Sequence, residues 1–352
     1  MAPSKSGFKP NELAYYSRQL VLAEIGLNGQ KKLKNARVLV AGVGGLGCQI
    51  SVQLASMGVG SIRLVDRDVV EMSNLQRQHL YDVDVIGYPK VEAAAMRLKK
   101  VNPFIEIEAR PVSINNKTAT RILEDVDLVV DGLDSLKPRL ALNRACVDRG
   151  VPYIYGAVIT HVGNVSTIIP GQTPCLECWQ GGVDEANVPT CATVGVMSPA
   201  ISIVASFQVS EAIRIILEKK PNLASKLLFF DLEDLSLETI KLAKADSCRT
   251  CGVGAKELEK MDPVEEVCGR NGKRVFTITP EELTDLDLQV VARRLDEMSL
   301  KKRLSTNLGL TFDGVEGFSG SIFKTGVAVV EGAKSRVDAV KIFEKLTSIE
   351  IE

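Results

Sequence analysis

The hydrophobic pattern between residues 37 and 65 predicts a strand, a glycine-rich turn, a helix and a second strand. The run Arg37–Ala41 consists mainly of β-branched and apolar side chains, as in a buried strand. It leads into residues 42–47, four of which are glycine, and apolar residues then recur at helical spacing as far as Met57. Gly58 ends that helix, and Ser61–Val65 supplies the second strand. A β-α-β unit of this kind is typical of a nucleotide-binding sheet.

Further apolar runs predict more strands, with helical patterns between them. Strands are expected at 105–109, 127–131, 152–157, 165–169 and 226–232, the last of them at the edge of the sheet. Helices are expected at 12–24, 28–34, 89–99 and 139–149, with a long apolar core helix over 200–217. Because strands alternate with helices, the sequence predicts a Rossmann-like α/β fold with a mostly parallel sheet.

A change of composition near residue 256 predicts a second domain. The segment 256–260 is highly charged and follows a glycine-rich stretch, as expected for a linker. The pattern beyond it indicates a helical turn after Thr279, a helix at 288–298, a hairpin of 318–323 with 326–331, and a closing helix at 335–346. We therefore expect a large α/β domain over 1–255 and a small α+β domain over 256–352.

Composition and charge exclude several classes of protein. The 352 residues are 45% hydrophobic and 25% charged, and the formal net charge of -1 offers no electrostatic attraction for nucleic acid or a membrane surface. The N-terminal residues lack an apolar stretch that could act as a signal peptide, and polar side chains interrupt the apolar segment 200–217. We therefore expect a cytoplasmic protein with no nucleic-acid and no membrane partner.

Histidine chemistry is nearly excluded, since His79 and His161 are the only histidines in the sequence. A Ser-His-Asp triad or a histidine-rich metal site cannot be assembled convincingly from them. A nucleophile in this chain therefore has to be activated by other groups.

The glycine turn and the acidic residue after the second strand predict a nucleotide site. Gly42, Gly44 and Gly47 have the spacing that lets backbone N–H groups approach phosphate at the positive start of a helix. Asp66 follows about 20 residues on, where a carboxylate accepts the protons of ribose hydroxyls. A turn required only for packing is the alternative. These residues alone do not separate NAD from ATP.

Cationic and amide side chains after Asp66 favour a triphosphate. The run Ser73–Gln78 contains Arg77, and Lys90 follows it, so two positive charges accompany several amides near the ribose end of the nucleotide. Cations on a solvated surface are the alternative. Their position after Asp66 favours ATP over NAD.

A further acidic residue, Asp134, stands just beyond the strand expected at 127–131. Open α/β sheets bind ligands at the carboxyl ends of their strands, and a carboxylate opposite two cations is a natural Mg²⁺ ligand. The alternative is that Asp134 only caps the turn that follows it. The sequence favours magnesium bound at Asp134.

Two Cys-x-x-Cys pairs predict a metal site. Each two-residue spacer lets both thiolates face one ion, so Cys175 and Cys178 with Cys248 and Cys251 fit a tetrahedral zinc site once the fold brings the pairs together. A redox pair or a disulfide is the alternative. Four thiolates leave no open coordination position, which indicates a structural metal.

One cysteine outside the pairs, Cys191, has the context of a nucleophile. It lies in a short polar-to-glycine stretch before the helix opened by Pro199, and the start of a helix favours the thiolate form. An inert small residue in a loop is the alternative. The remaining cysteines, Cys48, Cys146 and Cys268, are expected to pack in apolar surroundings.

Taken in order, these motifs resemble the adenylation domain of ubiquitin-activating enzymes and their relatives. The motifs are Gly42–Gly47, Asp66-Arg67-Asp68, Ser73–Gln78, Lys90, the Asp134 turn and the paired Cys-x-x-Cys, and the similarity runs from about Tyr16 to Gly252. The relatives adenylate sulfur-carrier proteins of molybdopterin, thiamine and transfer-RNA thiolation pathways. The resemblance implies that residues 1–255 form an ATP-binding, zinc-containing adenylation domain.

The resemblance also implies a role for individual residues. ATP would be bound by Gly42, Gly44, Gly45, Asp66, Asp68, Ser73, Asn74, Gln76, Arg77, Lys90, Asp134 and Ser135. Among these, Asp134 would hold magnesium and Arg77 would act in catalysis with it. Arg18, in Tyr16-Ser17-Arg18-Gln19, would reach the partner subunit's active site across a homodimer. Ser135 stands where the family usually has Asn, which leaves the second polar contact at this turn open.

The expected function is ATP-dependent adenylation of the C-terminal glycine of a small ubiquitin-like or sulfur-carrier protein ending in Gly-Gly. Cys191 would then accept the acyl group as a thioester, and a conjugating enzyme would be a further partner. The main alternative is an adenylyltransferase for a sulfur carrier that forms no thioester. An NAD-dependent oxidoreductase and a nucleotide-binding scaffold are the other two.

Overall fold

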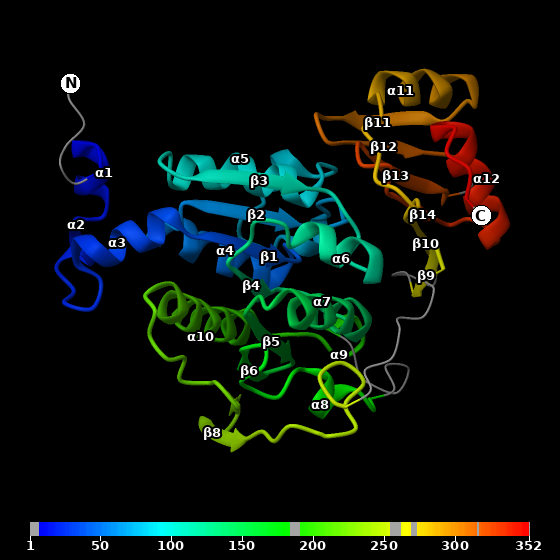
Figure 1. The fold of residues 1–352 in the computed structure, drawn as a ribbon. Coiled ribbons are helices and arrows are strands. Elements are labelled where there is room, and N and C mark those ends of the chain that lie inside the picture. Colours follow the sequence, from blue (N-terminus) through cyan, green and yellow to red (C-terminus); the bar gives the residue numbers. More distant parts are fainter. Residues whose placement is uncertain (1–6, 184–190, 254–261, 269–272, 315–316, 352) are drawn as a thin grey trace.

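The computed structural model describes residues 7–183, 191–253, 262–268, 273–314 and 317–351, which fold around two β-sheets (Figure 1). An eight-stranded mixed sheet with helices on both faces forms the larger part of the molecule. A six-stranded antiparallel sheet forms a separate C-terminal domain. The prediction of a Rossmann-like α/β fold with a smaller α+β domain is confirmed.

The larger sheet has the strand order β3-β2-β1-β4-β5-β6-β7-β8. Its strands are β1 (Arg37–Ala41), β2 (Ser61–Val65), β3 (Glu106–Arg110), β4 (Leu128–Asp131), β5 (Tyr153–Ile159), β6 (Val162–Ile168), β7 (Lys226–Asp231) and β8 (Ser236–Lys241). The strands from β3 to β5 are parallel, and β6, β7 and β8 each run antiparallel to the strand before. Because parallel strands end at the same edge, the loops after β1, β2 and β4 meet there.

The edge strands of this sheet are β3 and β8, so the prediction that residues 226–232 form an edge is wrong. β7 pairs with β6 on one side and with β8 on the other. Five of the six residues of β8 are exposed, so this strand lacks the buried apolar face that marks a strand in a sequence.

Different helices cover the two faces of the larger sheet. On one face lie α4 (Gly45–Met57), α5 (Lys90–Val101) and α10 (Ser198–Ile216), and on the other α6 (Asn116–Ile122) and α7 (Leu136–Arg149). Short helical turns are η1 (Met72–Asn74), η2 (Val83–Val85), α8 (Glu177–Gln180) and α9 (Cys191–Val194). Along β1, Val38 and Val40 belong to the first apolar core and Leu39 and Ala41 to the second.

The N-terminal helical segment is broken at Tyr16, where a single helix over 12–24 was expected. α1 (Pro10–Tyr15) and α2 (Ser17–Leu20) flank this residue, and α3 (Gly26–Asn35) follows. Tyr16 is buried, and its hydroxyl accepts a hydrogen bond of 2.8 Å from Nδ2 of Asn102. A Cβ at Gly58 would lie 2.5 Å from the Tyr16 ring, so the ring packs directly on the end of α4. Burial of this ring holds the chain at the bend.

The C-terminal sheet has the strand order β11-β12-β13-β14-β10-β9. Its elements are β9 (Val264–Cys268), β10 (Arg274–Ile278), α11 (Leu288–Glu297), β11 (Lys301–Ser305), β12 (Gly309–Asp313), β13 (Ser319–Phe323), β14 (Ala328–Glu331) and α12 (Arg336–Thr347). The predicted hairpin is β13–β14, and the predicted helices are α11 and α12. Residues after Thr279 form no helical turn, and β9 to β12 were not predicted. The domain boundary expected at residues 255 and 256 lies outside the described residues.

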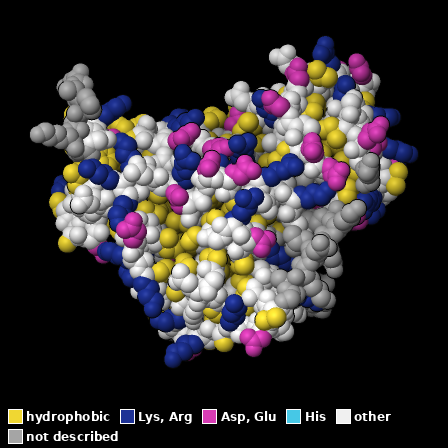
Figure 2. All heavy atoms as spheres, in the orientation of Figure 1, with side chains coloured by type: hydrophobic (Ala, Val, Ile, Leu, Met, Phe, Trp, Pro, Cys, Tyr) yellow, Lys and Arg dark blue, Asp and Glu magenta, His cyan; other side chains and the backbone are white. Residues whose placement is uncertain are grey.

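The apolar helix α10 is the one described helix whose length and composition would suit a membrane span, which is weak evidence by itself. Its buried side chains pack against α4 and against β5 and β6. On the face shown in Figure 2, basic and acidic side chains are interspersed around hydrophobic ones. The helix thus has the packing expected of a core element.

Candidate active site

The turn between β1 and α4 brings backbone close to backbone. Gly42 has a φ of +82°, and a Cβ on it would lie 2.8 Å from the carbonyl oxygen of Gly132. A Cβ on Gly47 would lie 1.9 Å from the carbonyl oxygen of Gly42. Gly44 is the N-cap of α4 and has no side chain to cap the first N–H groups of the helix, which are the groups that bind phosphate at a helix start.

Asp66, at the end of β2, is hydrogen-bonded to this turn. Its Oδ2 accepts a hydrogen bond of 2.7 Å from the backbone N–H of Val43, and its Oδ1 accepts one of 2.8 Å from the N–H of Asp68. Burial raises the pKa of the Asp66 carboxyl, and the positive charge of Lys90 opposes that shift. Asp66 therefore lies beside both the glycine turn and a cation.

The side chain of Lys90, the first residue of α5, lies in the same region as Asp66. Its Nζ lies 2.7 Å from Oδ2 of Asp68, and its side chain is only 8% exposed. Burial alone would lower the pKa of Lys90, but Asp68, Asp66 and Asp134 together raise it above its ordinary value. The lysine is therefore held as a cation.

The run from Ser73 to Gln78 begins within η1 and continues beyond it. Asn74 is buried and its Oδ1 accepts a hydrogen bond of 3.1 Å from the N–H of Glu71, whereas Gln76 is exposed. Arg77 is half-buried and its Nη1 donates to the carbonyl oxygen of Ser73 at 2.9 Å. In this arrangement Arg77 is bound to its own loop.

Gln78 is a candidate binding residue that the sequence analysis did not select. Its side chain is buried, Nε2 lies 3.9 Å from the position of a Cβ on Gly44, and Oε1 has no partner among the described residues. A buried unpaired amide beside the glycine turn suggests a ligand contact. The signal in the sequence was its place in the Ser73–Gln78 run.

Asp134 lies exposed in the turn between β4 and α7. The N-cap of α7 is Ser135, which makes no side-chain capping bond. After the charges of Asp68 and Asp66, that of Asp134 also raises the pKa of Lys90, as expected for a carboxylate in a loop at the same edge of the sheet. The structure thus brings Asp66, Asp68, Lys90 and Asp134 to one edge of the sheet.

A buried network supports this turn, and sequence reasoning missed it. Arg139 donates from Nε to Oδ2 of Asp131 at 3.0 Å and from Nη2 to the carbonyl oxygens of Leu133 and Gly156 at 2.5 and 2.9 Å. The hydroxyl of Tyr153 donates to the same Asp131 oxygen at 2.7 Å. Burial raises the pKa of Asp131, which the neighbouring Arg139 opposes. These contacts fix the backbone immediately before Asp134.

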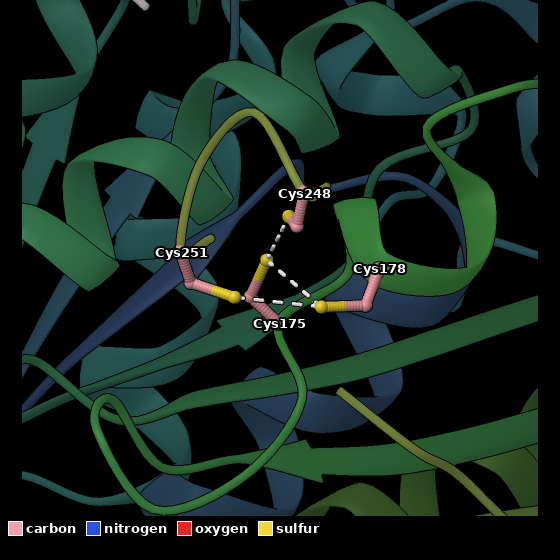
Figure 3. Close-up of side chains that lie close together, drawn as sticks. All are labelled: Cys175, Cys178, Cys248 and Cys251. Carbon is pink, nitrogen blue, oxygen red and sulfur yellow. Dashed lines mark hydrogen bonds between the residues drawn. The ribbon is translucent and has the colours of Figure 1, made fainter. Parts of the chain in front are cut away.

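The side chains of the four paired cysteines point toward one another in a single cluster (Figure 3). Sγ of Cys175 lies 4.0 Å from that of Cys178 and 3.6 Å from that of Cys248, and the Sγ atoms of Cys178 and Cys251 are 3.4 Å apart. Zinc–sulfur bonds of about 2.3 Å give a tetrahedron with edges of about 3.8 Å. The cluster therefore fits one tetrahedral ion, and it argues against two independent redox pairs.

Helix α7 is bonded to this cluster by an ion pair. Nε and Nη2 of Arg144 donate to the two carboxylate oxygens of Glu177 at 3.1 and 2.6 Å. Glu177 stands between the first two cysteines and also accepts a hydrogen bond from Thr250, which stands between the other two. The same helix that begins at the Asp134 turn thus packs on the cysteine cluster.

The structure does not join the last two candidate residues to this site. Arg18, on α2, is exposed and has no hydrogen bond or ion pair among the residues described. Cys191 is the first residue of α9, and its side chain lies outside the described part of the chain. The end of its segment is anchored at the β5–β6 turn, where Thr160 exchanges backbone hydrogen bonds with Gly195 and Met197 at 3.0 and 2.8 Å.

Cys48 and Cys146 are buried in apolar surroundings, as predicted. Burial raises the pKa of both thiols, that of Cys48 to about 12. The side chain of Cys268 lies outside the described residues. Neither of the two described thiols has the character of a nucleophile.

A Rossmann-like sheet with a glycine turn, a cluster of charged residues at its carboxyl edge and a four-cysteine site defines a class of nucleotide-dependent adenylyltransferase. The chain belongs to the ThiF family, whose model matches residues 16–250. This finding confirms the resemblance stated from the motifs.

Similar proteins cover either nearly the whole chain or about seven-tenths of it. The sulfur carrier protein ThiS adenylyltransferase of Bacillus subtilis is 34% identical over 339 residues, which is 94% of this chain and 98% of that protein. The SAMP-activating enzyme E1 of Haloferax volcanii is 36% identical over 256 residues, 72% of this chain and 94% of its own. The crystal structure of E. coli MccB with ATP has a TM-score of 0.60 and 26% identity, covering 67% of this chain and 74% of that one.

Proposed function

We propose that this chain uses ATP to adenylate the C-terminal glycine of a small sulfur-carrier or ubiquitin-like protein ending in Gly-Gly. The observation that carries the proposal is the convergence of Asp66, Asp68, Lys90 and Asp134 beside the glycine turn. The names of two similar proteins, a sulfur carrier protein ThiS adenylyltransferase and a SAMP-activating enzyme E1, support this choice of substrate.

The reaction needs binding and charge more than proton transfer. A carboxylate oxygen of the carrier attacks the α-phosphorus of ATP, a P–O bond forms, and the bond to the β-phosphate oxygen breaks so that pyrophosphate leaves with the electron pair. The attacking group is already an anion, so no general base is required. The step therefore does not depend on histidine, of which this chain has only two.

Each charged residue has a role in this proposal. Asp66 binds the ribose hydroxyls, and Asn74 and Ser73 contact the phosphates. Lys90 and Arg77 stabilise the charge that develops on the phosphate oxygens. Asp134 would hold Mg²⁺, which supplies further positive charge there, and Gly42, Gly44, Gly45, Asp68, Gln76 and Ser135 complete the ATP site.

The proposed assembly is a homodimer in which Arg18 acts in the partner's active site. Arg18 is exposed and unpaired among the residues described. The segment after it exposes Val21, Leu22 and Leu27, with Val21 80% accessible. Exposed apolar side chains close to Arg18 in the sequence are typical of a surface that a second copy of the chain covers in a dimer.

A second step is proposed at Cys191. Its thiolate attacks the carbonyl carbon of the acyl-adenylate, a C–S bond forms, and AMP leaves as the C–O bond breaks. The position of Cys191 at the start of α9, in a segment anchored to the β5–β6 turn, supports this step. The alternative is release of the acyl-adenylate to sulfur transfer without a thioester.

The cysteine cluster is proposed to hold structural zinc. Four thiolates from Cys175, Cys178, Cys248 and Cys251 fill a tetrahedron, so the ion has no open position for substrate. Its role would be to link the start of α8 and the residues just before it to the segment after β8. Reduced thiols of this kind suit the proposed cytoplasmic location.

An isotope-exchange assay tests the proposal against its rivals. We expect label from pyrophosphate to enter ATP only when the carrier protein is present. An NAD-dependent oxidoreductase would instead bind NADH with a change in nicotinamide fluorescence, and a scaffold would bind ATP without exchange.

A further inference from the structure

The C-terminal domain is hydrogen-bonded to the first turn of α5. Glu92 is buried at 7% exposure, and its two carboxylate oxygens accept the backbone N–H groups of Asn307 and Leu308, each at 3.1 Å. Asn307 and Leu308 form the turn between β11 and β12. A buried carboxylate that accepts two N–H groups makes a strong and directional contact.

Close packing surrounds this contact. A Cβ on Gly309 would lie 2.9 Å from Cγ of Pro89, so only glycine allows the β11–β12 turn to approach so closely. On the other side, the Cβ position of Gly87 is 3.4 Å from Cδ2 of Leu304. The C-terminal sheet therefore rests on the residues that lead into α5, as Figure 1 also shows.

The residues under the C-terminal sheet belong to the nucleotide site. The backbone N–H of Lys90 donates a hydrogen bond of 2.9 Å to the carbonyl oxygen of Asp68. The backbone N–H of Val70 donates to the carbonyl oxygen of Tyr88, and the N–H of Gly87 donates to that of Val70, both at 2.9 Å. Lys90 also forms its side-chain ion pair with Asp68. Glu92 lies two residues beyond Lys90 in the same helical turn. A displacement of the β11–β12 turn would therefore move both the lysine and its partner.

A second contact reaches the same loop. Arg67, between Asp66 and Asp68, donates from Nη1 to Oε2 of Glu265 on β9 at 3.1 Å and to the hydroxyl of Ser113 at 3.0 Å. Nearby, the hydroxyl of Thr325 donates to the carbonyl oxygen of Pro111 at 2.6 Å.

We propose that the C-terminal domain is a clamp on the ATP site, with Glu92 and Arg67 as its positioning residues. By fixing the first turn of α5 and the Asp66–Asp68 loop, the domain holds Lys90 where the triphosphate binds. ATP in turn tightens the contact between the domains, because coupling between two sites is reciprocal. This inference rests on the proposed function, since it assumes ATP at Lys90.

The clamp is tested in the full-length chain by hydrogen–deuterium exchange and by calorimetric titration with Mg-ATP. In the wild-type chain, ATP slows exchange at the amides of Asn307 and Leu308. Glu92→Ala raises the Kd for ATP about fivefold or more and removes this slowing, and Glu92→Gln, which keeps one acceptor, has a smaller effect. The matched control is Lys117→Ala, which breaks the exposed ion pair to Glu281 at another point of the interface and leaves the Kd unchanged.

Three results would overturn the clamp. These are ATP binding with no change in exchange at Asn307 and Leu308, a wild-type Kd in Glu92→Ala, and an equal loss of affinity in Lys117→Ala. A wild-type chain that binds no ATP would contradict the proposed function and the clamp together. If Glu92→Ala fails to fold, Glu92→Gln and the wild-type exchange measurement still decide the question.

Discussion

The ammonium group of Lys90 lies 2.7 Å from the carboxylate of Asp68, in a pair whose lysine side chain is buried and whose aspartate side chain is about half exposed. The lysine is thus held in place at its stem while its partner faces solvent. A triphosphate entering from the solvent side can share this cation or take it over from Asp68. In the proposed ATP site, this pair would be the state before the nucleotide binds.

Substitutions of Lys90 and Asp68 distinguish the effect of the lysine's charge from the effect of the aspartate that positions it. Lys90→Ala is expected to lower pyrophosphate exchange roughly a hundredfold, because a preorganised cation at the phosphates is lost. Asp68→Asn leaves the cation in place and is expected to have a smaller effect. Exchange assays on the two variants check this, and near-normal exchange in Lys90→Ala would exclude the lysine from the site.

The pair also predicts a pH dependence. Because Asp68, Asp66 and Asp134 raise the pKa of Lys90, its charge is fully present below its ordinary pKa and is lost only as the pH rises through the elevated value. Titration of Lys90 should therefore not weaken ATP binding between about pH 8 and pH 10. Asp68→Asn removes one of the charges that raise this pKa, so the loss of ATP affinity at high pH should begin at a lower pH than in the wild-type chain, as calorimetry at several pH values would detect.

The cysteine cluster predicts one zinc per chain. Cys251→Ser is expected to lose the ion and much of the thermal stability, because binding of a structural metal contributes directly to folding. Cys146→Ala, which changes a buried cysteine outside the cluster, should keep full zinc content. Metal analysis and thermal unfolding of both variants provide the check. A stable wild-type chain without metal would refute the assignment.

The proposed homodimer predicts complementation between two inactive chains. Arg18→Ala and Asp134→Ala should each abolish most exchange activity, since the arginine and the metal ligand serve the same site from different subunits. Mixed dimers of the two variants contain one site with both residues intact and should recover part of the activity. If mixing restores nothing, Arg18 does not act across the dimer.

Of the two proposed steps, only thioester formation needs Cys191, so a variant of this residue distinguishes it from adenylation. Adenylation needs no thiol, so Cys191→Ala should retain pyrophosphate exchange with the carrier while losing any covalent adduct that reducing agents cleave. Gel analysis with and without reductant detects the adduct. If the wild-type chain forms none with ATP and its carrier, the thioester step is wrong and a simple adenylyltransferase is the better account.

Local pattern was sufficient for much of the fold. β1 and β2 have the predicted ends because both are rich in apolar and β-branched residues and lie beside glycine, and α12 begins after the capping residue Ser335. β8 and β11 were not predicted because their residues are mostly exposed and charged or polar. Neither strand has a buried face, so hydrophobic and polar residues do not alternate along it. Sheet pairing, which no local pattern records, determines these strands.

Some residues of the candidate site could likewise be predicted from the sequence, and the contacts that support them could not. Asp66, Lys90 and Asp134 were selected because they follow strands or open a helix at one edge of the sheet. The ion pair of Arg139 with Asp131 joins α7 to β4, and the contact of Glu92 with the C-terminal domain joins residues 215 positions apart in the chain. Such contacts exist only after folding, and a single sequence carries no sign of them.

The most direct measurement compares two forms of one carrier in the exchange assay. The substrate is the small β-grasp protein ending in Gly-Gly from the same genome, prepared either with a free C-terminal carboxylate or as the C-terminal carboxamide. The account predicts exchange of pyrophosphate into ATP with the free carboxylate and none with the carboxamide, because only the carboxylate can attack the α-phosphorus. Exchange that is equal with both forms, or that needs no carrier, would contradict the central claim.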